Sequence, residues 1–146
     1  TFADLGVCNG DSFMLVMPAS VKQRGKVAGR EPVSIHPHDA AARGISHGDV
    51  VRVFNTRGAC LAGVEVKESI RQGVVQISTG AWLDPLNADD IGSLEKHGNP
   101  NVLTIDKGSS RLAQSCMAQT ALVEVELYEG ELPPITAFDT PKIVNK

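Results

Sequence analysis

The chain has 146 residues, a length that favours one domain with an adequate apolar core. Its 14 lysines and arginines and 17 acidic residues give a formal net charge of −3, with no long run of either sign. We therefore expect no nucleic-acid partner, since affinity for duplexes comes mostly from neutralised phosphates, and no membrane partner, since no apolar stretch reaches bilayer-spanning length. The first residue is Thr rather than Met, so we expect a processed protein or a piece of a longer one.

Short apolar stretches of strand length recur along the chain. The predicted strands cover residues 13–17, 32–36, 50–55, 59–66, 74–78 and 120–128. The continuous apolar run 13–17 is typical of a strand that is buried on both faces. In the last strand, apolar and polar residues alternate, which predicts that one face points inward. Many short strands at this spacing favour a closed barrel, because closure removes exposed strand edges.

Few segments between the strands have helical signals. Pro37 at a first helical position, three alanines and Gly44 predict one short helix over residues 36–44, with the histidines at its start capping it or exposed. Residues 101–105 are expected to be extended, and residues 109–114 to form one helical turn.

Residues 79–101 have neither period 2 nor period 3.6, and irregular stretches of this length are usually functional or disordered. This stretch holds the single tryptophan, Trp82, and four aliphatic residues, so we expect it to be ordered rather than disordered. Its polar residues, and those that follow up to Gln119, are mostly neutral amides and hydroxyls. Such groups donate and accept hydrogen bonds, which suits a polar heterocycle or a phosphate-bearing ligand better than proton transfer. A surface loop with Asx turns is the other interpretation.

No residue pattern predicts a catalytic group or a metal site. The four histidines lack metal-ligand spacing, and the three cysteines lack a C-x-x-C pair. Cys60 lies within a predicted strand and is expected to be a small buried hydrophobe. Asp39 and Asp49 are expected to cap a helix and close a turn rather than to act as an acid/base pair. No serine, cysteine or carboxylate has an evident activating base.

Two groups of motifs resemble known families. The unit Asp39-Ala40-Ala41-Ala42-Arg43-Gly44-Ile45-x-x-Gly48-Asp49-x-Val51 resembles the motif of double-psi β-barrels, which also form the substrate-recognition domains of some ring-forming ATPases. The second group comprises Gly73-Val74-Val75, Gly80-Ala81-Trp82-x-Asp84-Pro85, Gly98-Asn99-Pro100-Asn101-Val102-Leu103-Thr104, Leu112-Ala113-Gln114 and Ala118-Gln119-Thr120. In this order, these motifs closely resemble the C-terminal dinucleotide-binding domain of the dimethyl sulfoxide reductase family. Among its members, the motifs look like those of the biotin sulfoxide and trimethylamine N-oxide reductases.

The resemblance implies an all-β fold, a six-stranded double-psi β-barrel like that of aspartate decarboxylase, with short helices. It divides the chain into a lead-in strand and divergent connection (1–26), a barrel that binds a molybdopterin dinucleotide (27–130) and a surface tail (131–146). In that family, the domain closes over a molybdenum ion held by two pterin guanine dinucleotides, and the protein ligand of the metal lies in another domain. The implied cofactor is therefore molybdopterin guanine dinucleotide, and the implied partners are the remaining domains of a parent reductase. The bacterial cytoplasm and the periplasm both remain open as its compartment.

The resemblance also implies a binding site without a catalytic group. The candidate cofactor-binding residues are Trp82, Asn99, Asn101, Ser109, Gln114 and Gln119. Turn capping is the other role open to Ser109. The family usually has a longer loop with His and Ser where this chain has residues 18–24. The alternative function is that of a double-psi domain that recognises a peptide or a protein and has no redox role.

Overall fold

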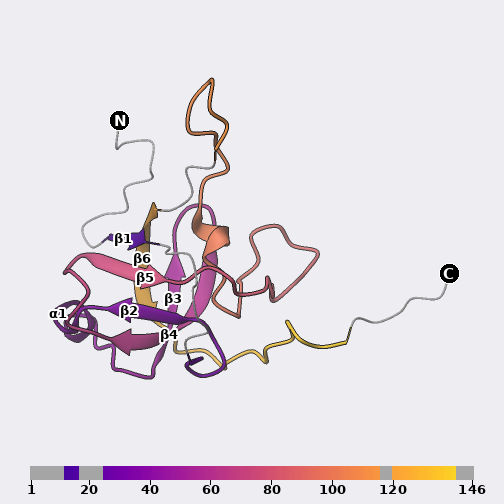
Figure 1. The fold of residues 1–146 in the computed structure, drawn as a ribbon. Coiled ribbons are helices and arrows are strands. Elements are labelled where there is room, and N and C mark those ends of the chain that lie inside the picture. Colours follow the sequence, from indigo (N-terminus) through magenta and orange to yellow (C-terminus); the bar gives the residue numbers. More distant parts are fainter. Residues whose placement is uncertain (1–11, 17–24, 116–119, 141–146) are drawn as a thin grey trace.

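A computed structural model describes residues 12–16, 25–115 and 120–140, in which six strands close a barrel (Figure 1). The strands are β1 (Phe13–Val16), β2 (Pro32–Ile35), β3 (Val50–Phe54), β4 (Ala59–Val66), β5 (Val74–Ile77) and β6 (Thr120–Leu127). The helical elements are α1 (Pro37–Ala41) and the 3₁₀ helix η2 (Pro100–Leu103). The predicted strands are thus confirmed, with ends that differ by one residue at most.

The order of the strands around the barrel is β1-β5-β2-β4-β3-β6. The pairs β1·β5 and β2·β4 are parallel, and the other four pairs are antiparallel. Exchanging β1, β2 and β3 with β4, β5 and β6 leaves every pair and its direction unchanged, so the barrel has an approximate two-fold symmetry. The two interlocked halves form a double-psi β-barrel, which confirms the predicted fold.

The core lies inside the barrel and consists almost entirely of aliphatic side chains. Its fully buried members include Leu15, Val51, Val53, Val75 and Ile77. In β4, Cys60, Ala62 and Val64 belong to this core, as expected for one face of a strand. Burial also raises the pKa of the Cys60 thiol, so the structure places this cysteine as a core residue.

Three local predictions are wrong. Contrary to the prediction for the run 13–17, β1 is not buried on both faces, because Met14 is 45% exposed on the outside of the barrel while Phe13 and Leu15 point inward. Of residues 101–105, predicted to be extended, the first three instead belong to η2, because Pro100 occupies its first position and Asn99 caps it. Residues 109–114 contain no helical turn, because hydroxyl groups hold them in tight non-helical turns.

The predicted helix forms, but it is shorter than expected. His36 is its N-cap, and the Nδ1 atom of His36 accepts a hydrogen bond from the backbone N–H of His38 at 3.1 Å. Gly44 follows the helix with φ +64°, the left-handed conformation that ends a helix at little cost in glycine.

The barrel is not confined to residues 27–130. β1 precedes this range, yet Leu15 pairs with Val75 on one side and with Ala121 on the other. The division of the rest of the chain stays a prediction. Cys8, the segment 18–24, Cys116, Gln119 and the tail beyond residue 140 lie outside the described residues.

Candidate functional site

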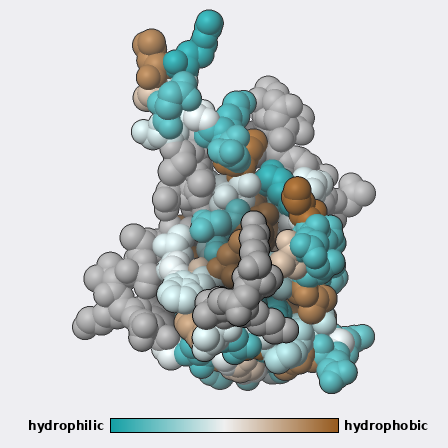
Figure 2. All heavy atoms as spheres, turned by 90° about the vertical axis from the view of Figure 1, so that its right-hand side faces the viewer, coloured by the Kyte–Doolittle hydropathy of each residue, from teal (hydrophilic) through white to brown (hydrophobic). Residues whose placement is uncertain are grey.

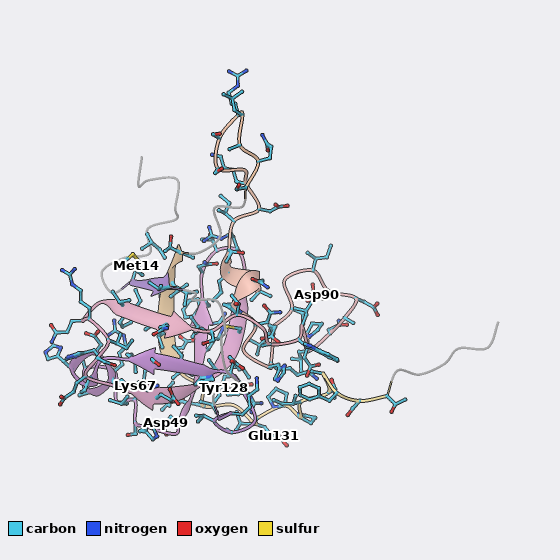
Figure 3. All side chains as sticks on the ribbon, in the orientation of Figure 1. Met14, Asp49, Lys67, Asp90, Tyr128 and Glu131 are labelled. Carbon is cyan, nitrogen blue, oxygen red and sulfur yellow. The ribbon has the colours of Figure 1, made fainter. Side chains whose placement is uncertain are left out.

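The candidate site is built on the long connection between β5 and β6. Its first part, residues 79–99, which we call the site loop, extends beyond the right-hand side of the barrel in Figure 1. Asp90 lies in the outer part of this loop, on the other side of the barrel from Met14 and Lys67 in the view of Figure 3. The loop returns to the barrel along β4, where Leu61 donates its N–H to Glu95 O at 2.8 Å and Glu95 donates to Ala59 O at 3.0 Å. Glu95 therefore continues the sheet at the half of β4 that β2 does not reach.

The side chain of Glu95 organises the site loop. This carboxylate is fully buried. Its Oε1 accepts the N–H groups of Asp84 and His97 at 3.2 and 3.0 Å, and its Oε2 accepts those of Gly98 and Asn99, both at 2.7 Å. Burial raises the pKa of Glu95, against the four hydrogen bonds, which favour the charged form. One carboxylate thus ties both ends of the site loop together.

The start of η2 is held as closely as the loop. Gly98 has φ +95°, and a Cβ atom there would lie 2.6 Å from Glu31 Cβ, so only glycine fits. Asn99 is buried, and both ends of its amide are in use. Its Oδ1 accepts the N–H of Asn101 at 3.0 Å, and its Nδ2 donates to Ala81 O at 3.0 Å. Asn99 is therefore a positioning residue.

His97 adds a buried atom with unmet hydrogen-bonding capacity. Its ring lies 3.0 Å, through Nδ1, from Trp82 O. Because a carbonyl only accepts, Nδ1 carries a proton, which leaves Nε2 of the neutral ring as an acceptor. This Nε2 is buried and has no hydrogen-bond partner among the described residues.

The structure brings together three of the candidate binding residues. Trp82 is 64% exposed, and its backbone carbonyl is fixed by His97. Asn101 is exposed beside Asn99, and its side chain makes no hydrogen bond within the described part of the chain. Trp82 and Asn101 thus present a flat ring and a free amide on a backbone that Glu95 and Asn99 fix.

Ser109 and Gln114 lie elsewhere. They belong to residues 105–115, the arm, which projects upward from the barrel in Figure 1. Ser109 Oγ donates to Ala113 O at 2.8 Å, and Gln114 Nε2 donates to Ser110 O at 3.1 Å. Both side chains therefore fold the arm on itself. Gln119 lies outside the described residues.

The apolar residues of the site loop do not hold it down as expected. Leu83, Leu86 and Ile91 are exposed, and hydrophobic side chains appear among hydrophilic ones on the face shown in Figure 2. Buried polar and charged groups hold the loop instead. The sequence analysis missed these residues, which are Asp84, Glu95, Lys96 and His97. Asp84 stands within one of the quoted motifs and the other three directly precede the Gly-Asn-Pro-Asn motif, but charged residues are normally exposed, so no pattern predicted their burial.

Comparison with known proteins shows which class of barrel this is. The described residues combine a closed double-psi barrel with a polar loop that buried hydrogen bonds hold beside it. Residues 15–122 match the family model described as "Molydopterin dinucleotide binding domain". The chain belongs to this family. The solved structure of acetylene hydratase from Pelobacter acetylenicus shares the fold, with a TM-score of 0.60 and 12% identity over 87% of this chain and 19% of that one.

Two curated relatives are much more similar in sequence. Trimethylamine-N-oxide reductase of Salmonella typhi is 52% identical over 122 residues, which are 84% of this chain and 14% of the relative. Dimethyl sulfoxide/trimethylamine N-oxide reductase of Cereibacter sphaeroides is 50% identical over 123 residues, 84% of this chain and 15% of the relative. The chain thus spans about one seventh of the length of these relatives, and it is a domain of a larger protein.

Family membership confirms the predicted cofactor, molybdopterin guanine dinucleotide, and favours cofactor binding over peptide recognition. Trp82 and Asn101 suit this cofactor, because the indole ring of Trp82 is exposed and the amide of Asn101 can both donate and accept hydrogen bonds. Within the described ranges, no group of three or more His, Cys, Asp and Glu side chains could hold a metal ion, and no helix could cross a membrane.

Proposed function

We propose that this chain is the cofactor-binding domain of a molybdenum-dependent S-oxide or N-oxide reductase, in which it closes over the bis(molybdopterin guanine dinucleotide) cofactor. The observation that carries the proposal is the identity of 50% or more with reductases of this kind across 84% of the chain. When bound, the cofactor supplies the redox chemistry of molybdenum. The chain supplies binding and orientation, so the isolated chain is not expected to reduce S-oxides or N-oxides.

In this proposal, Trp82 and Asn101 contact the cofactor directly. The indole ring is open to stack on a pterin or a guanine, as aromatic rings do with flat heterocycles. The amide of Asn101 matches the mixed donors and acceptors on the edges of these rings. Gln119 has the same chemistry and remains a proposed ligand. Ser109 and Gln114 remain candidates whose contribution depends on where the arm lies in the whole protein.

Asn99 and Asn101 provide a matched pair of variants for the test. Asn101→Ala in the parent protein should lower cofactor content, because the loss of one hydrogen bond to a buried polar ligand costs roughly 1–3 kcal/mol, or about 5- to 150-fold in affinity. In the 146-residue chain it should leave the melting temperature almost unchanged, since the side chain is exposed. Asn99→Ala should lower that melting temperature, because it removes the cap of η2.

The measurement is the amount of guanine nucleotide and pterin released from the purified parent protein, per molecule of protein. Trp82→Ala and Gln119→Ala are measured beside Asn101→Ala. The proposed site is wrong if all three variants retain the unmutated cofactor content.

A further inference from the structure

Residues 131–140, the described part of the predicted surface tail (131–146), form specific contacts with the site loop. We call this segment the strap. It leaves β6 and passes below and to the right of the barrel in Figure 1, where it is the yellow end of the ribbon. Arg30, which is almost fully buried, donates from Nη2 to Pro133 O at 2.7 Å. The strap is therefore bound from its start.

The carboxylate of Asp84 holds the middle of the strap. Its Oδ2 accepts the N–H groups of Thr136 and Ala137 at 2.6 and 3.0 Å, and its Oδ1 accepts the hydroxyl of Thr136 at 2.7 Å. Lys96 Nζ lies 3.3 Å from Asp84 Oδ1 and donates to Thr136 Oγ1 at 2.8 Å. Asp84 thus accepts three hydrogen bonds from the strap, and Lys96 donates to the strap as well as pairing with Asp84, so the strap supplies most of the partners of this buried pair.

The end of the strap reaches the candidate cofactor residue. The ring of Phe138 lies 5.5 Å from that of Trp82, between ring centroids, and 5.2 Å from that of His97, edge to face. His97 in turn holds the carbonyl of Trp82. The strap thus restrains Trp82 twice, once by direct contact between the rings and once through His97.

We propose that the strap positions Trp82 for the cofactor, with Thr136 and Phe138 as positioning residues. The binding of the cofactor at Trp82 rests on the proposed function, whereas the restraint of Trp82 by the strap does not. Trp82 is largely exposed, and an exposed side chain keeps its rotamer freedom unless a neighbour restrains it. Fixing the ring before the cofactor arrives removes an entropic cost from binding.

The first test uses the single tryptophan of the 146-residue chain as its own probe. Time-resolved fluorescence anisotropy should show greater fast motion of Trp82 in Phe138→Ala and in Thr136→Val. Thr136→Ser, which keeps the hydroxyl, should restore the unmutated decay. Leu132→Ala is the matched control, since Leu132 is a partly exposed apolar residue of the same strap without a ring contact to Trp82. Circular dichroism verifies that each variant is folded. Unchanged anisotropy in both folded variants would overturn the proposal.

The second test links the strap to binding in the parent protein. Phe138→Ala should lower cofactor affinity by about 2- to 12-fold, the value of one aromatic pair. In a Trp82→Ala background the same change should have no further effect, because Phe138 acts through Trp82. An equal loss in both backgrounds would overturn the positioning role. If Trp82→Ala alone leaves cofactor content unchanged, the proposed function of Trp82 fails, while the anisotropy result on the strap stands.

Discussion

The two-fold symmetry of the barrel relates two connections that differ greatly. Residues 36–49 join β2 to β3, and residues 78–119 occupy the equivalent place between β5 and β6. The first, which we call the short connection, holds only α1 and turns. The second, the long connection, holds the site loop, η2 and the arm. The strands at both ends are equivalent, so the barrel fixes where each connection begins and ends but does not dictate what lies between.

The two connections are also held by different means. The short connection is closed by exposed, mostly local hydrogen bonds, such as that from Ser46 N to Asp49 Oδ2 at 2.7 Å. Asp39 does not cap the helix as predicted, since its carboxylate accepts the N–H of Gly73. The long connection depends on the buried charges of Glu95 and of the Asp84–Lys96 pair. The compact connection thus combines local turns with Ala40 and Ile45, which are packed in the core, whereas the long one uses buried charges in place of apolar contacts.

The largest effect on stability should come from substitutions in the barrel core, at the strands from which the two connections begin. Ile35 and Ile77 end the two equivalent strands β2 and β5 and are fully buried. Ile35→Ala and Ile77→Ala should each lower the free energy of unfolding by about 2–5 kcal/mol, because each removes apolar contact and leaves a cavity. Urea unfolding measures both. A loss confined to one of them would show that the halves of the barrel are not equivalent in stability.

A comparable effect should separate the two connections. Glu95→Gln keeps the shape of the side chain but turns an NH₂ group toward two backbone N–H donors. It should therefore cost roughly 2–6 kcal/mol, since each of the two buried donors left without an acceptor costs about 1–3 kcal/mol. Asp49→Asn is the control in the short connection and should change stability by less than about 1 kcal/mol, because its hydrogen bond is exposed. Equal losses in the two variants would contradict the distinction.

The smallest expected effect is a difference in titration within the long connection. Burial raises the pKa of Asp84, but the hydrogen bonds from Thr136 and the hydrogen bond and charge of Lys96 together outweigh it, so this pKa should lie below its ordinary value of 3.8. The pKa of Glu95 should lie above its ordinary value of 4.5, because burial outweighs its four hydrogen bonds. Carboxyl-carbon NMR titration measures both, and a Glu95 that titrates below Asp84 would contradict this order.

These directions have opposite consequences for stability. Asp84 contributes stability above about pH 3.8, and this contribution is lost as the pH falls through its folded-state pKa. The contribution of Glu95 is greatest below about pH 4.5 and declines as the pH rises through its folded-state pKa.

The sequence by itself determined the barrel, the family and the cofactor. Strand signals are local, since apolar residues with period 2 and glycine turns act on neighbouring residues. The double-psi fold and the dinucleotide-binding family followed from motifs such as that from Asp39 to Val51, whose order is visible without a structure. Trp82 and Asn101 were predicted as cofactor ligands in this way. The structure places both at the surface, Trp82 in the site loop and Asn101 in η2, and their role stays a prediction.

Only the tertiary structure decided how the site is held. Nothing near Glu95 in the sequence indicates burial, which arises because this residue fills the place beside β4 that β2 leaves open. Asp84 and Thr136 are 52 positions apart and meet only after the strap has crossed the site loop. Charged residues are normally solvated, so their burial depends on partners that distant segments supply. Such partners carry no local pattern, and for this reason the contacts between the surface tail and the site loop could not be predicted from the sequence.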